Sequence, residues 1–110
     1  MQIQIPSYAN STKIDLVRRT GALDEISRSK NCCTVNVDRR YNSRSLRSSI
    51  MYFVAKGAKK LGQRPARVLP KKGEGIQLLG KAPKQFIEGI QLEIEEKRRE
   101  SKRTTGYYRI

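Results

Sequence analysis

Residues 44–61 read RSLRSSIMYFVAKGAKKL, and this stretch has the clearest helical pattern in the sequence. Its apolar residues recur at the spacing i, i+4, i+7 and i+8, which places them on one side of an α-helix. They are Leu46, Ile50, Phe53, Val54, Gly57, Ala58 and Leu61. Asn42, Ser43 or Ser45 can cap the first turn, and Gly62 suits the position after the last turn. We therefore expect a helix over residues 44–61.

The opposite side of this helix is basic. At 100° per residue it presents Arg44, Ser48, Tyr52, Lys56 and Lys59, with Arg47 and Lys60 on its flanks. The helix contains no Asp or Glu, although an ordinary solvent-exposed helix mixes charges to gain i,i+4 ion pairs. The sequence thus favours a positively charged binding face on this helix.

Residues 62–79 continue as GQRPARVLPKKGEGIQLL, and residues 64–79 predict a β-hairpin. Two short apolar stretches flank a connection that contains glycines, which is typical of paired antiparallel strands. The prolines at 65 and 70 confine the first strand to the edge of a sheet. The approach to the hairpin carries Arg64 and Arg67, and its tip carries Lys71 and Lys72.

The flanking segments predict further short elements. Residues 2–5 and 32–37 alternate with period two and are typical of strands. A helix from about residue 83 to residue 100 has Pro83 in its first turn. Its apolar side consists of Phe86, Ile87, Ile90 and Ile94. Two short helices are expected before Gly21 and over residues 22–29, although the first of these segments fits a strand as well.

These elements together predict a small single α+β domain over residues 1–100, followed by a basic and aromatic tail over residues 101–110. We expect a short antiparallel sheet packed with two to three helices, in which the basic helix is followed directly by the basic hairpin.

The positive charge of the 110-residue chain is concentrated in its middle. Lys and Arg number 24 against 10 Asp and Glu, which gives a net charge of +14. Residues 41–84 hold eleven of the basic residues and a single acid, Glu74. Like charges inside a folded domain repel one another unless an anionic partner neutralises them. Such a basic footprint indicates nucleic acid as the partner.

The residue types do not indicate an enzyme. The chain has no His, the commonest general base and metal ligand. The segment from Gly75 to Lys81 matches GxxxxGK, but Ala82 replaces the hydroxyl residue that a phosphate-binding loop uses for Mg²⁺. Adjacent Cys32 and Cys33 do not supply the four ligands of a structural zinc site and are expected to be reduced thiols. We expect no enzymatic activity, no cofactor and no metal.

Composition also bears on location. There is no run of 18 apolar residues, and the N-terminus MQIQIPSY lacks the basic and apolar regions of a secretory signal. We expect no membrane partner and a cytoplasmic protein, or one associated with the nucleoid or nucleus.

The sequence therefore predicts a non-enzymatic protein that binds nucleic acid through a basic helix and a basic hairpin. Duplex DNA is slightly favoured over RNA, because a basic helix suits the major groove. The candidate contact residues are Arg44, Arg47, Tyr52, Lys56, Lys59, Lys60, Arg64, Arg67, Lys71 and Lys72. This layout resembles winged-helix DNA-binding proteins in outline over residues 44–79, without a diagnostic motif, so no family is assigned.

Several alternatives remain open. The same charges suit a small inhibitor or adaptor that docks on an acidic protein, or a structural component of an RNA-containing particle. An assembly role is a third alternative, with a homodimer formed through Phe86, Ile90 and Ile94. Tyr52 fits equally well as an exposed ring that stacks on a base and as a half-buried ring under the hairpin.

Overall fold

The computed structural model describes residues 13–29, 33–37, 43–73 and 75–107, and it describes the side chains of these residues except at 43 and 102–107. Its elements follow in the order α2 (Lys13–Arg19), α3 (Ala22–Arg28), β1 (Cys33–Asn36), α4 (Ser43–Leu61), β2 (Val68–Lys71), β3 (Gly75–Leu78) and α5 (Ala82–Tyr107). This is the predicted small α+β fold, although four helices are described instead of two to three. The strand predicted over residues 2–5 lies outside the described residues.

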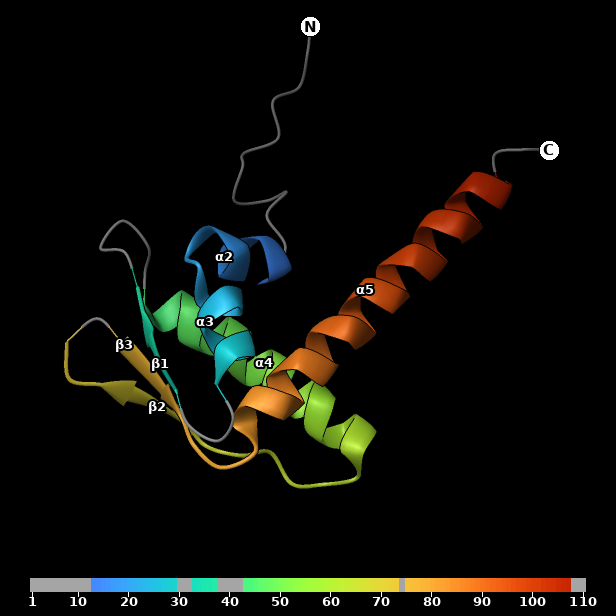
Figure 1. Ribbon diagram of the computed structural model, residues 1–110. Helices are drawn as coiled ribbons and strands as arrows, with labels where there is room; N and C mark the ends of the chain where they lie inside the picture. Colours follow the sequence, from blue (N-terminus) through green and yellow to red (C-terminus); the bar gives the residue numbers. More distant parts are fainter. Residues whose placement is uncertain (1–12, 30–32, 38–42, 74, 108–110) are drawn as a thin grey trace, which may run out of the picture.

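The three strands form one antiparallel sheet in the order β1-β3-β2, so β2 is an edge strand. Pro70 lies in β2, and an edge strand tolerates a proline because it pairs on one side alone and needs fewer backbone N–H donors than an inner strand. Val35 of β1 pairs with Ile76 of β3, and both are buried on the side of the sheet that the helices cover. Figure 1 shows the sheet at one edge of the molecule and the helices beside it. The strand predicted over residues 32–37 is thereby confirmed, and so is the antiparallel pairing of the two strands predicted within residues 64–79.

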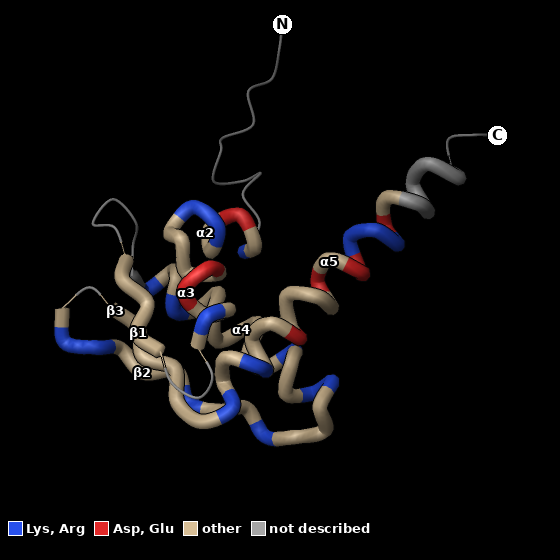
Figure 2. The backbone as a smooth tube through the Cα atoms, viewed as in Figure 1, with Lys and Arg blue, Asp and Glu red and all other residues tan. Residues whose placement is uncertain are grey.

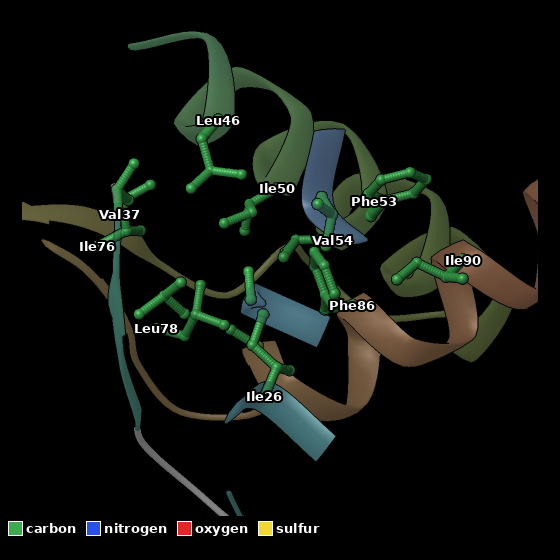
Figure 3. Close-up of a cluster of buried hydrophobic side chains, with 14 of the residues drawn as sticks. Ile26, Val37, Leu46, Ile50, Phe53, Val54, Ile76, Leu78, Phe86 and Ile90 are labelled. Carbon is green, nitrogen blue, oxygen red and sulfur yellow. The ribbon is translucent and has the colours of Figure 1, made fainter. Parts of the chain in front are cut away.

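The core lies between the sheet and α4, and between α4 and α5 (Figure 3). The apolar spacing of residues 44–61 has its predicted consequence, because six of the seven predicted apolar residues of α4 are buried and Leu61 is half-buried. Ser49 is buried as well, although it was not among the predicted residues. The fully buried hydrophobic residues of α4 are Leu46, Ile50, Phe53, Val54 and Ala58. From the other elements, α2 contributes Ile14 and Val17, and α3 contributes Ala22 and Ile26. Packing on this core makes the N-terminal segment helical where its sequence pattern also fits a strand.

Helix α4 ends as its sequence predicts. Gly62 follows the last helical residue with φ +66°, a left-handed conformation that glycine adopts without steric cost. The N–H of Gly62 donates to the Lys59 carbonyl at 3.2 Å, and that of Gln63 donates to the Ala58 carbonyl at 2.9 Å. These bonds satisfy carbonyls at the end of the helix and start the chain on its way back to β2.

Helices α4 and α5 cross in close contact at two glycines. A Cβ atom placed on Gly57 would lie 1.6 Å from the carbonyl oxygen of Gln85, and one on Gly89 would lie 1.9 Å from that of Phe53. Both distances are far below the 3.0 Å that real Cβ atoms respect, so only glycine permits this approach at either position. The close approach brings the Phe53 and Phe86 rings edge to face, with centroids 5.5 Å apart.

A buried amide ties the connection between α4 and β2 to α5. Gln85 has 1% of its surface exposed, and its Oε1 accepts a hydrogen bond from the Ala66 N–H at 2.8 Å. Its Nε2 donates to the Arg64 carbonyl at 3.0 Å. Because both ends of the amide are paired, the connection that carries Arg64 and Arg67 has a fixed path.

Helix α5 begins at Ala82, with Pro83 in its first turn as predicted, and continues to Tyr107 through most of the predicted tail. Its C-terminal part extends away from the body of the molecule (Figure 1). The homodimer surface predicted on this helix needs correction, because Phe86 and Ile90 are buried in the core. Of the three residues named for it, Ile94 alone is half-buried, so Phe86 and Ile90 are not available to a second copy.

Within the part of the chain that is described, no helix has the length and hydropathy needed to cross a membrane.

Candidate nucleic-acid interface

A basic hollow lies between the first turns of α4 and the hairpin. Its volume is about 210 Å³, and it is lined by Arg44, Arg47, Pro70, Lys71, Gly73, Gly75 and Ile76. Two arginines of the helix thus line one hollow together with a lysine of β2, which lies 24 residues or more along the chain. Neither glycine carries a side chain, so hairpin backbone forms part of the wall. An anionic group is the ligand chemistry that such a lining accepts.

The remaining predicted residues of the hairpin are exposed. Lys72 follows β2 at the tip, and Arg64 and Arg67 lie on the connection that leads into β2. Lys59 is exposed near the C-terminal end of α4. These four side chains are therefore available to a large anionic partner.

Lys56 is not on a free basic face, and its predicted placement needs correction. Its Nζ donates to Glu93 Oε2 at 2.6 Å and to Glu96 Oε2 at 2.7 Å, and both acids belong to α5. Its side chain is 21% exposed. Lys60 has an acidic neighbour as well, since its Nζ lies 3.5 Å from Glu88 Oε2. Helix α5 therefore neutralises one side of α4 with carboxylates that the sequence of α4 does not contain.

Tyr52 joins the same cluster. Its hydroxyl donates to Glu93 Oε2 at 3.0 Å, and its ring packs edge to face on Phe53 with centroids 5.5 Å apart. The ammonium groups of Lys13 and Lys56 lie 4.5 Å and 5.0 Å from the ring centroid. Of the two alternatives for Tyr52, the half-buried ring is the observed one, but the residue that its hydroxyl binds belongs to α5 and not to the hairpin.

The pKa values of the paired groups follow from this geometry. Burial alone would lower the pKa of Lys56, but its hydrogen bonds to Glu93 and Glu96 outweigh burial, and the pKa is raised. Burial alone would raise the pKa of Glu93, whereas the hydrogen bonds from Lys56 and Tyr52 hold it below its ordinary range. Both groups are therefore charged at neutral pH, and the charge of Lys56 is already matched by carboxylates.

The exposed side of α4 is rotated from the side that the sequence alone predicts. Tyr52 and Lys56 lie at the contact with α5, and the exposed residues are Arg44, Ser45, Ser48, Met51, Ala55, Lys59 and Lys60. Met51 and Ala55 were not among the predicted site residues. Among the described residues, Met51 is one of two large hydrophobic residues that are exposed, with 51% of its surface accessible. Neither methionine nor alanine indicates a binding site by its residue type. Only the position of α5, which covers the neighbouring side of α4, shows that Met51 and Ala55 lie on the exposed side.

Among the described residues, the acidic side chains are confined to three helices, which carry basic side chains as well (Figure 2). Acidic residues lie on α2, α3 and α5, whereas the hairpin and the connection before it show only basic ones. From Ser43 to Ile87, none of the described residues is Asp or Glu. Glu74 lies outside the described residues. Folding therefore keeps the basic middle of the sequence together as a basic part of the surface.

The described residues contain no group of three or more His, Cys, Asp or Glu side chains placed to hold a metal ion. Cys33 is half-buried in β1 against the core, and Cys32 lies outside the described residues. The GxxxxGK segment starts in strand β3 and ends in the turn before α5. Because most of the residues between its two glycines belong to the strand, they do not form a loop that could surround phosphates.

Comparison of the chain with protein-family models, with curated protein sequences and with solved structures gives no match.

Proposed function

We propose that this chain is a non-enzymatic nucleic-acid-binding protein. Its contact surface, which we name the hairpin–helix surface, consists of Arg44, Arg47, Lys71 and Lys72. The observation that carries the proposal is the basic hollow, where basic residues of α4 and β2 line one space of about 210 Å³. Bringing like charges together costs free energy in the free protein, and an anionic partner recovers it.

Other features support this assignment. Arg64 and Arg67 are exposed on a connection of fixed path, so they can extend the contact along a nucleic-acid backbone. The layout of a helix followed by a hairpin resembles winged-helix DNA-binding proteins in outline. Lys56 and Lys60 are not part of the proposed surface, because carboxylates of α5 neutralise them. Such a function places the chain in the cytoplasm or with the nucleoid or nuclear DNA.

Salt dependence tests the proposal. The protein, freed of bound nucleic acid, is titrated against a labelled DNA duplex by fluorescence anisotropy at several salt concentrations. Each neutralised phosphate contributes about 0.9 to the slope of log affinity against log salt, so four contacts give a slope of about −3.6. No binding near physiological salt overturns the proposal and leaves an acidic protein as the partner to seek.

A pair of matched variants locates the surface. Lys71→Ala with Lys72→Ala removes two charges from the hairpin, and we expect the slope to become shallower by about 2. Arg98→Ala with Arg99→Ala removes the same charge from exposed positions on α5 and controls for general electrostatic attraction. Equal effects of the two double variants would show that the hairpin is not the contact site.

A further inference from the structure

A stripe of exposed residues runs along α4 on the side that α5 leaves open. At about 100° per residue, residues 44, 48, 51, 55 and 59 fall within a narrow range of helix angle. All five are exposed, and we name this set the α4 stripe: Arg44, Ser48, Met51, Ala55 and Lys59. Because the set continues for four turns, it is a continuous face of the helix and not a single exposed position.

The composition of the α4 stripe suits a groove with charged edges. A cation stands at each end, and Ser48 and Ala55 are small enough to let the helix backbone approach a partner closely. The hydroxyl of Ser48 can donate or accept a hydrogen bond, and the exposed Met51 offers an apolar contact. An α-helix fits the major groove of B-form DNA, which is about 12 Å wide and presents polar base edges and thymine methyl groups.

The surroundings of α4 distinguish its two halves. Beside the C-terminal half lie Glu93 and Glu96 of α5, whose carboxylates repel phosphates although Lys56 balances part of their charge. Beside the N-terminal half lies the basic hollow, to which Arg47 and Lys71 contribute. A polyanion is therefore attracted more strongly to the N-terminal half, although Lys59 is exposed in the C-terminal half.

We propose that the N-terminal half of α4 enters the major groove of duplex DNA, with Ser48 and Met51 facing the base edges. The cations of the basic hollow then lie against phosphates at the edge of the groove. This inference rests on the proposed function and narrows its partner from nucleic acid in general to B-form DNA. The major groove of double-stranded RNA is deep and narrow, so side chains of a helix do not read it.

The first experiment compares duplexes. Anisotropy titrations at one fixed salt concentration use a DNA duplex and an RNA duplex of the same sequence and length. We expect the DNA duplex to bind at least about tenfold more tightly, because the helix enters the major groove of B-form DNA alone. Equal affinities for the two duplexes overturn the inference and leave the proposed function in place.

The second experiment places a negative charge on the stripe. Met51→Glu and Ser48→Glu are made separately, and Gln91→Glu on an exposed position of α5 adds the same charge away from the stripe. We expect each stripe variant to weaken binding of the DNA duplex about tenfold, since a carboxylate beside phosphates and base edges is repelled. The control is expected to change affinity less than about twofold.

The outcomes distinguish a failure of the groove inference from a failure of the proposed function. Far-UV circular dichroism selects the folded variants, and both stripe positions are exposed, so neither substitution removes a core contact. A folded stripe variant that binds like Gln91→Glu overturns the groove inference. If Lys71→Ala with Lys72→Ala still weakens binding, the proposed function survives that result. Absence of binding by the unmodified protein to any nucleic acid overturns both.

Discussion

Replacing Gly57 with alanine would place a methyl group 1.6 Å from the carbonyl oxygen of Gln85 and 2.4 Å from its carbonyl carbon. Because the neighbour is helix backbone, it cannot rotate away as a flexible side chain would. The helices must separate until the contact reaches about the 3.0 Å that real Cβ atoms respect. That separation also pulls Phe53 from Phe86, whose rings now lie in edge-to-face contact.

The magnitude follows from two opposing effects. Overpacking costs about 1–3 kcal/mol and more where the neighbour cannot yield, so we take about 4 kcal/mol for this backbone contact. Alanine recovers about 1 kcal/mol through its higher helix propensity. The expected net loss in the free energy of unfolding is about 3 kcal/mol. With about 4 °C per kcal/mol for a domain of this size, Tm falls by about 12 °C.

Urea unfolding followed by far-UV circular dichroism measures the effect, because the chain is largely helical and has no Trp. Gly62→Ala is the matched control. It has open space around its Cβ position but a positive φ, and we expect a loss of only about 1–2 kcal/mol. If Gly57→Ala loses no more stability than this control, the close crossing of α4 and α5 is refuted.

Gly89→Ala provides a second view of the same crossing, because its methyl group would meet the carbonyl oxygen of Phe53 at 1.9 Å. Both substitutions demand the same separation of helices. We therefore expect the double variant to lose less stability than the two single losses added together. Strict additivity would mean that the glycines act at independent sites.

Two further predictions concern the contacts of α5. Gln85→Leu leaves the Ala66 N–H and the Arg64 carbonyl without their partner, and we expect it to lower the free energy of unfolding by about 2 kcal/mol. Gln63→Leu at an exposed position of the same connection is the control, and a loss as large there would contradict the assigned role of Gln85. The lowered pKa of Glu93 stabilises the fold above the ordinary glutamate pKa of about 4.3, and this contribution is lost as pH falls through the lower folded value. Lys56→Met removes one cause of the lowered pKa of Glu93. The urea midpoints measured at pH 7 and pH 3 should therefore differ less in this variant than in the unmodified protein. An unchanged difference would contradict the ion pair between Lys56 and Glu93.

The sequence predicted local structure well where local chemistry decides it. The apolar spacing of residues 44–61 identified the buried side of α4, and Gly62 and Pro83 identified where helices end and begin. Pro70 predicted an edge strand, because proline lacks the N–H that an inner strand needs on both sides. Each of these predictions depends on residues that are close together in the chain.

The candidate site was predicted only in part, because its surroundings come from distant residues. Arg44, Arg47 and Lys71 were named from the sequence, and the structure brings them around one hollow. Lys56 was named on the same grounds, but Glu93 and Glu96 neutralise it from α5. In the sequence, Glu93 has an equally good partner four residues on at Lys97, so the pattern of α5 gave no reason to assign it to α4.

What the sequence determined by itself is the charge of its middle segment and the amphipathic character of α4. The tertiary structure decided which side of α4 stays open. Gly57 and Gly89 let α5 approach closely, and its glutamates then bind the cations on one side of the helix. The remaining open side carries Met51 and ends beside the basic hollow. The physical reason is that ion pairing acts over a few ångströms in space, and only packing determines which charges come that close.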